Sequence, residues 1–143
     1  MTNLTGEKVS VNQVINAFQE ASKATGAIPE HFKAEADGDN SRYILRVEFA
    51  SRVDEPTLRE FLQALDNTLK HDNIEYKAKR DSTRLGPPVL HVMREGWYER
   101  GRRKLAESGK RVFQAKTELL SPVKLETQVV KPELVSIIEL NDT

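Results

Sequence analysis

The feature that most constrains the fold of this sequence is a change in the spacing of its apolar residues. They recur at every second position over 42–50, which is the period of a β-strand with one buried face. After Asp54 and Pro56 they recur at every third or fourth position over 57–70, the period of an amphipathic helix of about four turns. A strand that leads directly into such a helix predicts a core shared by both kinds of element.

Other segments extend this pattern in both directions. Ser10 and Gln13 have the spacing of a capping box, and the apolar stripe behind them predicts a helix over 11–25 that ends at Gly26. Alternation over 31–36 predicts a β-hairpin with 42–50. The later elements that we expect are a short helix over 73–80, a strand over 88–93, a helix over 97–108, an extended segment over 111–116, a strand over 123–130 and a short helix from Pro132 through Ile138.

The order of these elements predicts the α+β class, with an antiparallel or mixed β-sheet packed against helices. A length of 143 residues suits one ordinary domain, and no repeat or low-complexity linker divides the chain. We therefore expect a small single domain over 10–143, preceded by a hinge- or linker-like segment over 1–9. The tail over 121–143 has no role that the sequence defines.

Composition excludes several classes of site. The chain has no cysteine, so disulfides, thiolate catalysis and cysteine-ligated metal centres are ruled out, and a cytoplasmic location is expected. No stretch approaches the roughly 18 apolar residues of a membrane-spanning helix, and the first residues lack the apolar run of a signal peptide. We therefore expect a soluble protein with no membrane partner.

The residue types most used in catalysis and metal binding show no recognisable arrangement. His31, His71 and His91 lack the spacing of metal ligands, so we expect structural or surface roles and no metal site. The sequence has neither a nucleophile elbow nor a phosphate loop, which argues against a self-contained nucleotide site. The carboxylates that fall on predicted solvent-facing positions are Glu20, Glu48 and Glu60.

Charge is unevenly distributed, although 22 basic and 22 acidic residues give a total of zero. Residues 70–116 contain 13 basic and 6 acidic residues, a net charge of +7, with aromatic residues between the cations. Such a segment could bind nucleic acid, form a solvated helix face, or dock against a nucleotide held by another domain. The zero total gives no general argument for nucleic acid.

Three separated strings share their order and spacing with a known family. They are Gly6-Glu7-Lys8-Val9-Ser10; then Asn73-x-x-Tyr76-x-x-x-Arg80, with Leu85-Gly-Pro-Pro and Gly96 after it; and finally Gln114-x-Lys116. Over about residues 4–120 they resemble the C-terminal domain of the acyl acid amido synthetases. This is the Gretchen Hagen family of auxin- and jasmonate-conjugating enzymes and their bacterial relatives, within the adenylate-forming ligases. The family usually continues the last string with proline and arginine, where this chain has Thr117 and Glu118.

The resemblance implies a two-step reaction in the complete enzyme. ATP and magnesium activate a small carboxylic acid as an acyl-adenylate, and the amine of an amino acid then displaces AMP to form an amide. The C-terminal domain rotates between the steps on a hinge, to which Gly6 gives backbone freedom. Lys116 is the expected catalytic residue, since its ammonium can offset charge beside the α-phosphate, and Lys8 is the expected cofactor-binding residue.

Other residues of the strings have structural interpretations. Asn73, Tyr76 and Arg80 are expected to shape the connection after the long helix rather than to touch substrate. Gly86 and Gly96 are expected to serve as turn positions.

The chain lacks the motifs that should bind ATP and the acid, so alone we expect a non-catalytic domain that holds no cofactor. Its expected partner is the large N-terminal adenylating domain, in cis or in trans. Because the sequence begins just before Gly6, we expect a domain separated from that partner rather than a natural short protein. The alternatives are a stand-alone basic binding or regulatory module, including a nucleic-acid-binding one, and an interaction domain that uses exposed parts of 57–70 or the tail 134–140.

Overall fold

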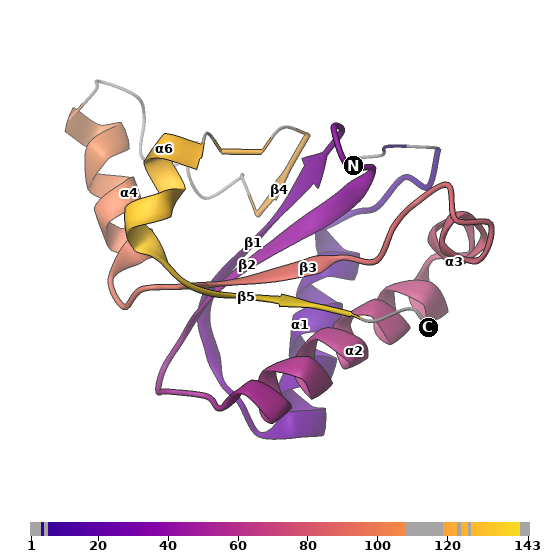
Figure 1. Ribbon diagram of the computed structural model, residues 1–143, viewed down its shortest axis with the longest axis horizontal. Coiled ribbons are helices and arrows are strands. Elements are labelled where there is room, and N and C mark those ends of the chain that lie inside the picture. Colours follow the sequence, from indigo (N-terminus) through magenta and orange to yellow (C-terminus); the bar gives the residue numbers. More distant parts are fainter. Residues whose placement is uncertain (1–3, 5, 108–118, 123, 126, 141–143) are drawn as a thin grey trace.

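The computed structural model describes residues 4, 6–107, 119–122, 124–125 and 127–140. Within these residues one five-stranded sheet has the strand order β4-β1-β2-β3-β5, and helices pack against it (Figure 1). The elements in chain order are α1 (Val11–Thr25), β1 (Pro29–Asp37), β2 (Arg42–Phe49), α2 (Glu55–Asp72), α3 (Ile74–Asp81), β3 (Val89–Met93), α4 (Trp97–Glu107), β4 (Leu120–Ser121), α6 (Thr127–Val130), a 3₁₀ turn η1 (Lys131–Glu133) and β5 (Leu134–Glu139). This arrangement confirms the predicted small α+β domain.

The first helix begins and ends where its sequence predicts. The Ser10 hydroxyl accepts the amide of Gln13 at 3.2 Å, and the Gln13 side chain accepts the amide of Ser10 at 3.0 Å. Gly26 closes α1 with a φ of 79°, a left-handed conformation that costs glycine little. The predicted helix over 11–25 is therefore confirmed.

The sheet is mixed because of the way its strands connect. β1 and β2 form the predicted antiparallel hairpin, and β2 and β3 run parallel. A parallel pair needs a long crossover connection, which α2 and α3 provide. β5 then pairs antiparallel with β3, and the two-residue β4 pairs parallel with β1.

The hydrophobic core lies between the sheet and the pair α1 and α2, which both cover the same face (Figure 1). Aromatic rings join the layers: Phe18 of α1 stacks on Phe32 of β1 with centroids 4.2 Å apart. Phe61 of α2 meets Phe18 at 5.9 Å and Phe49 of β2 at 5.1 Å. The whole predicted stripe of α2 is buried, as its period of three and four residues requires: Leu58, Phe61, Leu62, Leu65 and Leu69.

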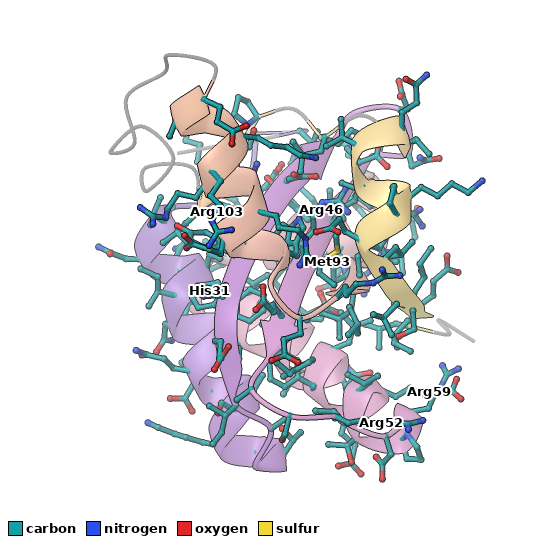
Figure 2. All side chains as sticks on the ribbon, turned by 90° about the vertical axis from the view of Figure 1, so that its left-hand side faces the viewer. His31, Arg46, Arg52, Arg59, Met93 and Arg103 are labelled. Carbon is teal, nitrogen blue, oxygen red and sulfur yellow. The ribbon has the colours of Figure 1, made fainter. Side chains whose placement is uncertain are left out.

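The opposite side of the sheet, which we call the open face, carries charged residues. Because side chains alternate along a strand, Lys33, Glu35 and Asp37 of β1 lie on this face with Arg46 and Glu48 of β2. The helices α4 and α6 stand over one end of it, and Figure 2 shows this side of the molecule. A second apolar cluster forms there; its buried members are Met93, Trp97 and Val130.

Two predictions for the C-terminal tail are wrong. Residues 127–130 form the helical turn α6 instead of a strand, and Val130 buries its side chain against Met93 and Trp97. The helix expected from Pro132 through Ile138 is instead η1 followed by β5. The outer edge of β3 offers ladder partners to β5 and places Ile138 opposite Leu90 in the core, so sheet pairing overrides the local helix signal.

The extended segment expected over 111–116 lies outside the described residues. In the parts of the chain that are described, no helix combines the length and the apolar character needed to cross a bilayer.

Candidate functional site

The first and second strings of the sequence meet at one place, which we call the N-terminal junction: residues 6–9 together with Asn73. The Asn73 side-chain amide donates to the carbonyl of Glu7 at 2.8 Å and to that of Lys8 at 3.2 Å. Its side-chain oxygen accepts the amide of Tyr76 at 2.9 Å, which caps α3. The Asn73 backbone amide closes α2 on the Leu69 carbonyl at 2.9 Å, and its buried side chain starts α3 and fixes the segment that precedes α1.

Glu7 fixes the same segment through its side chain. It is 1% exposed, and its carboxylate accepts the hydroxyl of Tyr43 on β2 and the amide of Leu4. Burial, and then the adjacent Glu7 carboxylate, raise the pKa of Tyr43 well above its usual range, so its hydroxyl stays a donor. The backbone from Glu7 onward is therefore attached to the body of the domain.

The neighbours of Glu7 have left-handed backbones. Gly6 has a φ of 102° and is exposed, and Lys8 has a φ of 49°, which is uncommon for a residue with a side chain. The Lys8 side chain is exposed to solvent, where a phosphate could reach it. Lys116, the predicted catalytic residue, lies outside the described residues.

Tyr76 and Arg80 belong to a buried polar triad centred on Asp66. Asp66 is 0% exposed; it accepts the Tyr76 hydroxyl at 2.6 Å, and Arg80 donates to both of its oxygens, at 3.1 and 2.8 Å. Burial is the largest cause of the raised pKa of Tyr76, followed by the charge of Asp66. The triad joins α2 to α3, which agrees with the structural role expected of Tyr76 and Arg80.

The position of Asp66 in the sequence already indicates that its carboxylate is buried and paired. Asp66 lies on the apolar stripe of α2, between the buried residues Leu62, Leu65 and Leu69. A carboxylate on a buried stripe needs a partner, and an arginine on the next helix can supply one.

The open face contains a second buried network. Arg46 is 1% exposed and donates through Nε to Glu35 at 2.8 Å, while its NH1 lies 3.0 Å from Nδ1 of His91. Glu35 also accepts the amide of Leu125 at 3.2 Å. Burial and the neighbouring Arg46 cation lower the pKa of His91 to about 4, so this histidine is neutral near pH 7.

Glu48 is placed differently from its expected solvent-facing position. It is 3% exposed, and its two oxygens accept the amides of Gly96 and Tyr98 at 3.0 Å each, which caps the first turn of α4. Tyr98 stacks on His31 with centroids 4.2 Å apart. The expectation for Glu48 is wrong because α4 folds back over the sheet, and the alternation over 42–50 carries no information about that helix.

One group of side chains approaches the geometry of a metal site. Ligand atoms of Glu30, His31 and Glu48 lie within 4.8 Å of one another. Both Glu48 oxygens already accept amides, so the cap of α4 accounts for the position of Glu48, and Glu30 is exposed.

Over 70–107, the part of the basic segment that the structure describes, several of the cations are held in ion pairs. Arg80 is paired with Asp66, Arg100 with Glu133, and Arg102 with Glu99. Of its aromatic residues, Tyr76 is 0% exposed and Trp97 is 8% exposed, so neither offers a ring face for bases to stack on.

Comparisons with known proteins identify relatives of the whole domain. A family model described as the GH3 family C-terminal domain matches residues 12–124. A solved structure of a GH3.15 acyl acid amido synthetase is similar with a TM-score of 0.78 and 15% identity, over 96% of this chain and 27% of that chain. Another solved structure, AtGH3.15 acyl acid amido synthetase in complex with 2,4-DB, has a TM-score of 0.76 and 17% identity; the similarity covers 96% of this chain and 26% of that chain. A search of curated proteins finds no match.

Proposed function

Since the chain belongs to the GH3 family, as a C-terminal domain of the acyl acid amido synthetases, we propose that it is the mobile domain of an ATP-dependent acid–amino acid ligase. The observation that carries the proposal is the family match over 12–124, in a chain that spans about a quarter of the synthetase structures it resembles. The remainder of such an enzyme is the large adenylating domain. This chain acts with that domain, in cis or in trans, and alone is inactive.

The N-terminal junction supports a rotation that begins before Glu7. Asn73 and Tyr43 attach Glu7 to the domain body, so a turn of the whole domain has to be absorbed outside this attachment. Gly6 is exposed and has no Cβ, so its backbone can change φ at little steric cost. A pivot at Gly6 requires the hydrogen bond from the Leu4 amide to Glu7 to break, and the described residues from Glu7 onward then move as one body.

ATP and magnesium fit the large domain better than the described residues. Of the described side chains that approach a metal-like grouping, Glu48 is engaged in capping α4, and the sequence holds no glycine-rich phosphate loop. This chain would contribute cations to a nucleotide bound elsewhere. Lys8 projects from the pivot toward solvent, and Lys116 is the cation that offsets charge at the α-phosphate.

The amide-forming reaction takes a small carboxylic acid and an amino acid, and we assign it to the cytoplasm. A chain with no cysteine gains nothing from an oxidising compartment.

The test is ATP–pyrophosphate exchange with a panel of small carboxylic acids. It is run on this chain alone, on the large domain alone, on their mixture, and on a polypeptide that contains both. Exchange should require the large domain, and Lys116→Ala in the combined polypeptide should lower it about 10²–10³-fold, as loss of a transition-state charge contact does. Lys23→Ala on α1 is the matched control and should leave exchange unchanged. Exchange that survives Lys116→Ala would remove the lysine's role, and a combined polypeptide that exchanges with no acid would contradict the proposed function.

A further inference from the structure

A groove of about 290 Å³ lies where α4 crosses β1 and faces α6. Its apolar lining comes from Phe32, Trp97, Tyr98, Leu119, Leu125 and Val129. Small-molecule sites usually measure roughly 300–1,000 Å³ and combine apolar walls with a few polar groups. The volume therefore suits a ligand built on a single ring.

The polar residues of this groove are predominantly cationic. Lys33, Arg100, Arg102 and Lys104 line it. Lys33 is paired with Glu35 at 3.3 Å and Arg102 with Glu99 at 2.9 Å. Glu133 is held by Arg100, whose Nε donates to its two oxygens at 2.9 and 3.1 Å. Among the described residues Lys104 has no ion pair, so an incoming anion finds an uncompensated charge on α4.

The helix that forms one wall carries a glycine at the groove. Gly101 lies in the interior of α4, where glycine costs about 1 kcal/mol relative to alanine. Its φ is not positive, so no turn or cap requires it. A methyl group there would have no heavy atom within 4 Å among the described parts of the chain, its own helix aside. The missing side chain leaves the groove open at the expense of helix stability.

We propose that this groove binds a small aromatic anion, with the ring against the apolar lining and the charged group near Lys104. The apolar lining removes such a ring from water, and the Lys104 ammonium can pair with a carboxylate or phosphate. The proposal goes beyond the function proposed above and does not depend on it, because the groove is made by this chain alone.

The test uses the fluorescence of Trp97, which is the single tryptophan of the chain. The 143-residue chain is titrated with 3-phenylpropionate, its alcohol 3-phenylpropanol, its amine 3-phenylpropylamine, and 2-phenylethyl phosphate. We expect a saturable change with a Kd of about 1 mM or tighter for an anion, binding of the alcohol at least about threefold weaker, and no binding of the amine. A tighter carboxylate or a tighter phosphate would each support the site and identify its charged group.

Three variants localise the binding. Gly101→Leu fills the groove and should weaken the anion at least about tenfold, whereas Gly101→Ala, which keeps most of the space, should retain it. Lys104→Met should weaken the anion about threefold and leave the alcohol unchanged. Lys77→Met, on α3 away from the groove, is the matched control for a lost charge.

The proposal is overturned if no ligand gives a saturable change up to about 10 mM, a concentration above the expected Kd. It is also overturned if the alcohol binds as well as the anions, or if folded Gly101→Leu binds like the original chain. If Gly101→Leu does not fold, the proposal is tested by the binding of the anion to Lys104→Met and by the comparison of the four ligands. Because every measurement uses this chain alone, failure here leaves the exchange assay of the proposed function unaffected.

Discussion

Replacement of Asn73 tests whether the N-terminal junction is attached to the body of the domain. Asn73→Ser keeps a side-chain oxygen that can cap α3, but it lacks the amide group that donates to the carbonyls of Glu7 and Lys8. Asn73→Ala removes the cap as well. The pair of variants therefore separates the attachment from the cap.

The expected magnitudes follow from the hydrogen bonds lost. Three donated bonds leave with Asn73→Ser, to the carbonyls of Glu7 and Lys8 and to Gln13 Oε1, so we expect a loss of about 1–3 kcal/mol in the free energy of unfolding. Asn73→Ala should cost about 1 kcal/mol more through the cap. Urea unfolding measures both, and Asn67→Ala, an exposed position on α2, is the control.

A second measurement addresses the attachment itself. Lys8 is exposed, and trypsin can cut after it only when the surrounding backbone opens. Cleavage at Lys8 under native conditions should be faster in Asn73→Ser than in the original chain, and unchanged in Asn67→Ala. If Asn73→Ser unfolds within about 0.5 kcal/mol of the original chain and Lys8 is cut no faster, the attachment contributes nothing and the argument for a pivot at Gly6 fails.

Two further predictions concern the buried polar groups. Tyr76→Phe removes a hydroxyl that donates to the buried Asp66 carboxylate at 2.6 Å, so urea unfolding should show a loss of about 1.5–3 kcal/mol. A loss below about 0.5 kcal/mol would mean that Arg80 and Lys70, which also contact Asp66, satisfy it without the hydroxyl. The lowered pKa of His91, about 4, means that the unfolded chain binds a proton at higher pH than the folded chain, so stability should fall as pH drops from about 6.5 to 4, by up to about 1.4 kcal/mol per pH unit. His91→Gln should lack this contribution, and equal slopes for the two proteins over that window would refute it.

The first half of the fold could be predicted because its signals are local and agree with the tertiary structure. Ser10 and Gln13 cap α1 as their spacing predicts, and Asp54 accepts the amide of Thr57 at the start of α2. The apolar stripe of α2 meets the alternating face of β2 in one core. The positions of these elements therefore follow from the local sequence of each segment.

The predictions for the C-terminal tail are wrong for the opposite reason, because the structure of the tail depends on residues far away in the chain. Val130 turns inward because Met93 and Trp97 lie against it, and Ile138 is a strand residue because β3 has a free edge. The β-branched residues of 134–139 did favour a strand, but Pro132 suggested a helix start instead. Pairing with a distant strand decided between these local signals.

The residues of the candidate site also differ in how well the sequence predicts them. The spacing of Asn73, Tyr76 and Arg80 indicated structural positions, and their contacts agree with that interpretation. Periodicity placed Glu48 in solvent, because only the return of α4 over the sheet gives this carboxylate its two amide donors.

The position of β5 late in the described chain affects the order in which the domain can fold during synthesis. α1, the hairpin and α2 leave the ribosome first and can pack together, but β3 then has one unpaired edge. That edge stays available to any other strand until residues 134–139 have emerged and paired with it. A pause in translation before residue 134 would therefore prolong the interval in which the nascent domain is most exposed to aggregation.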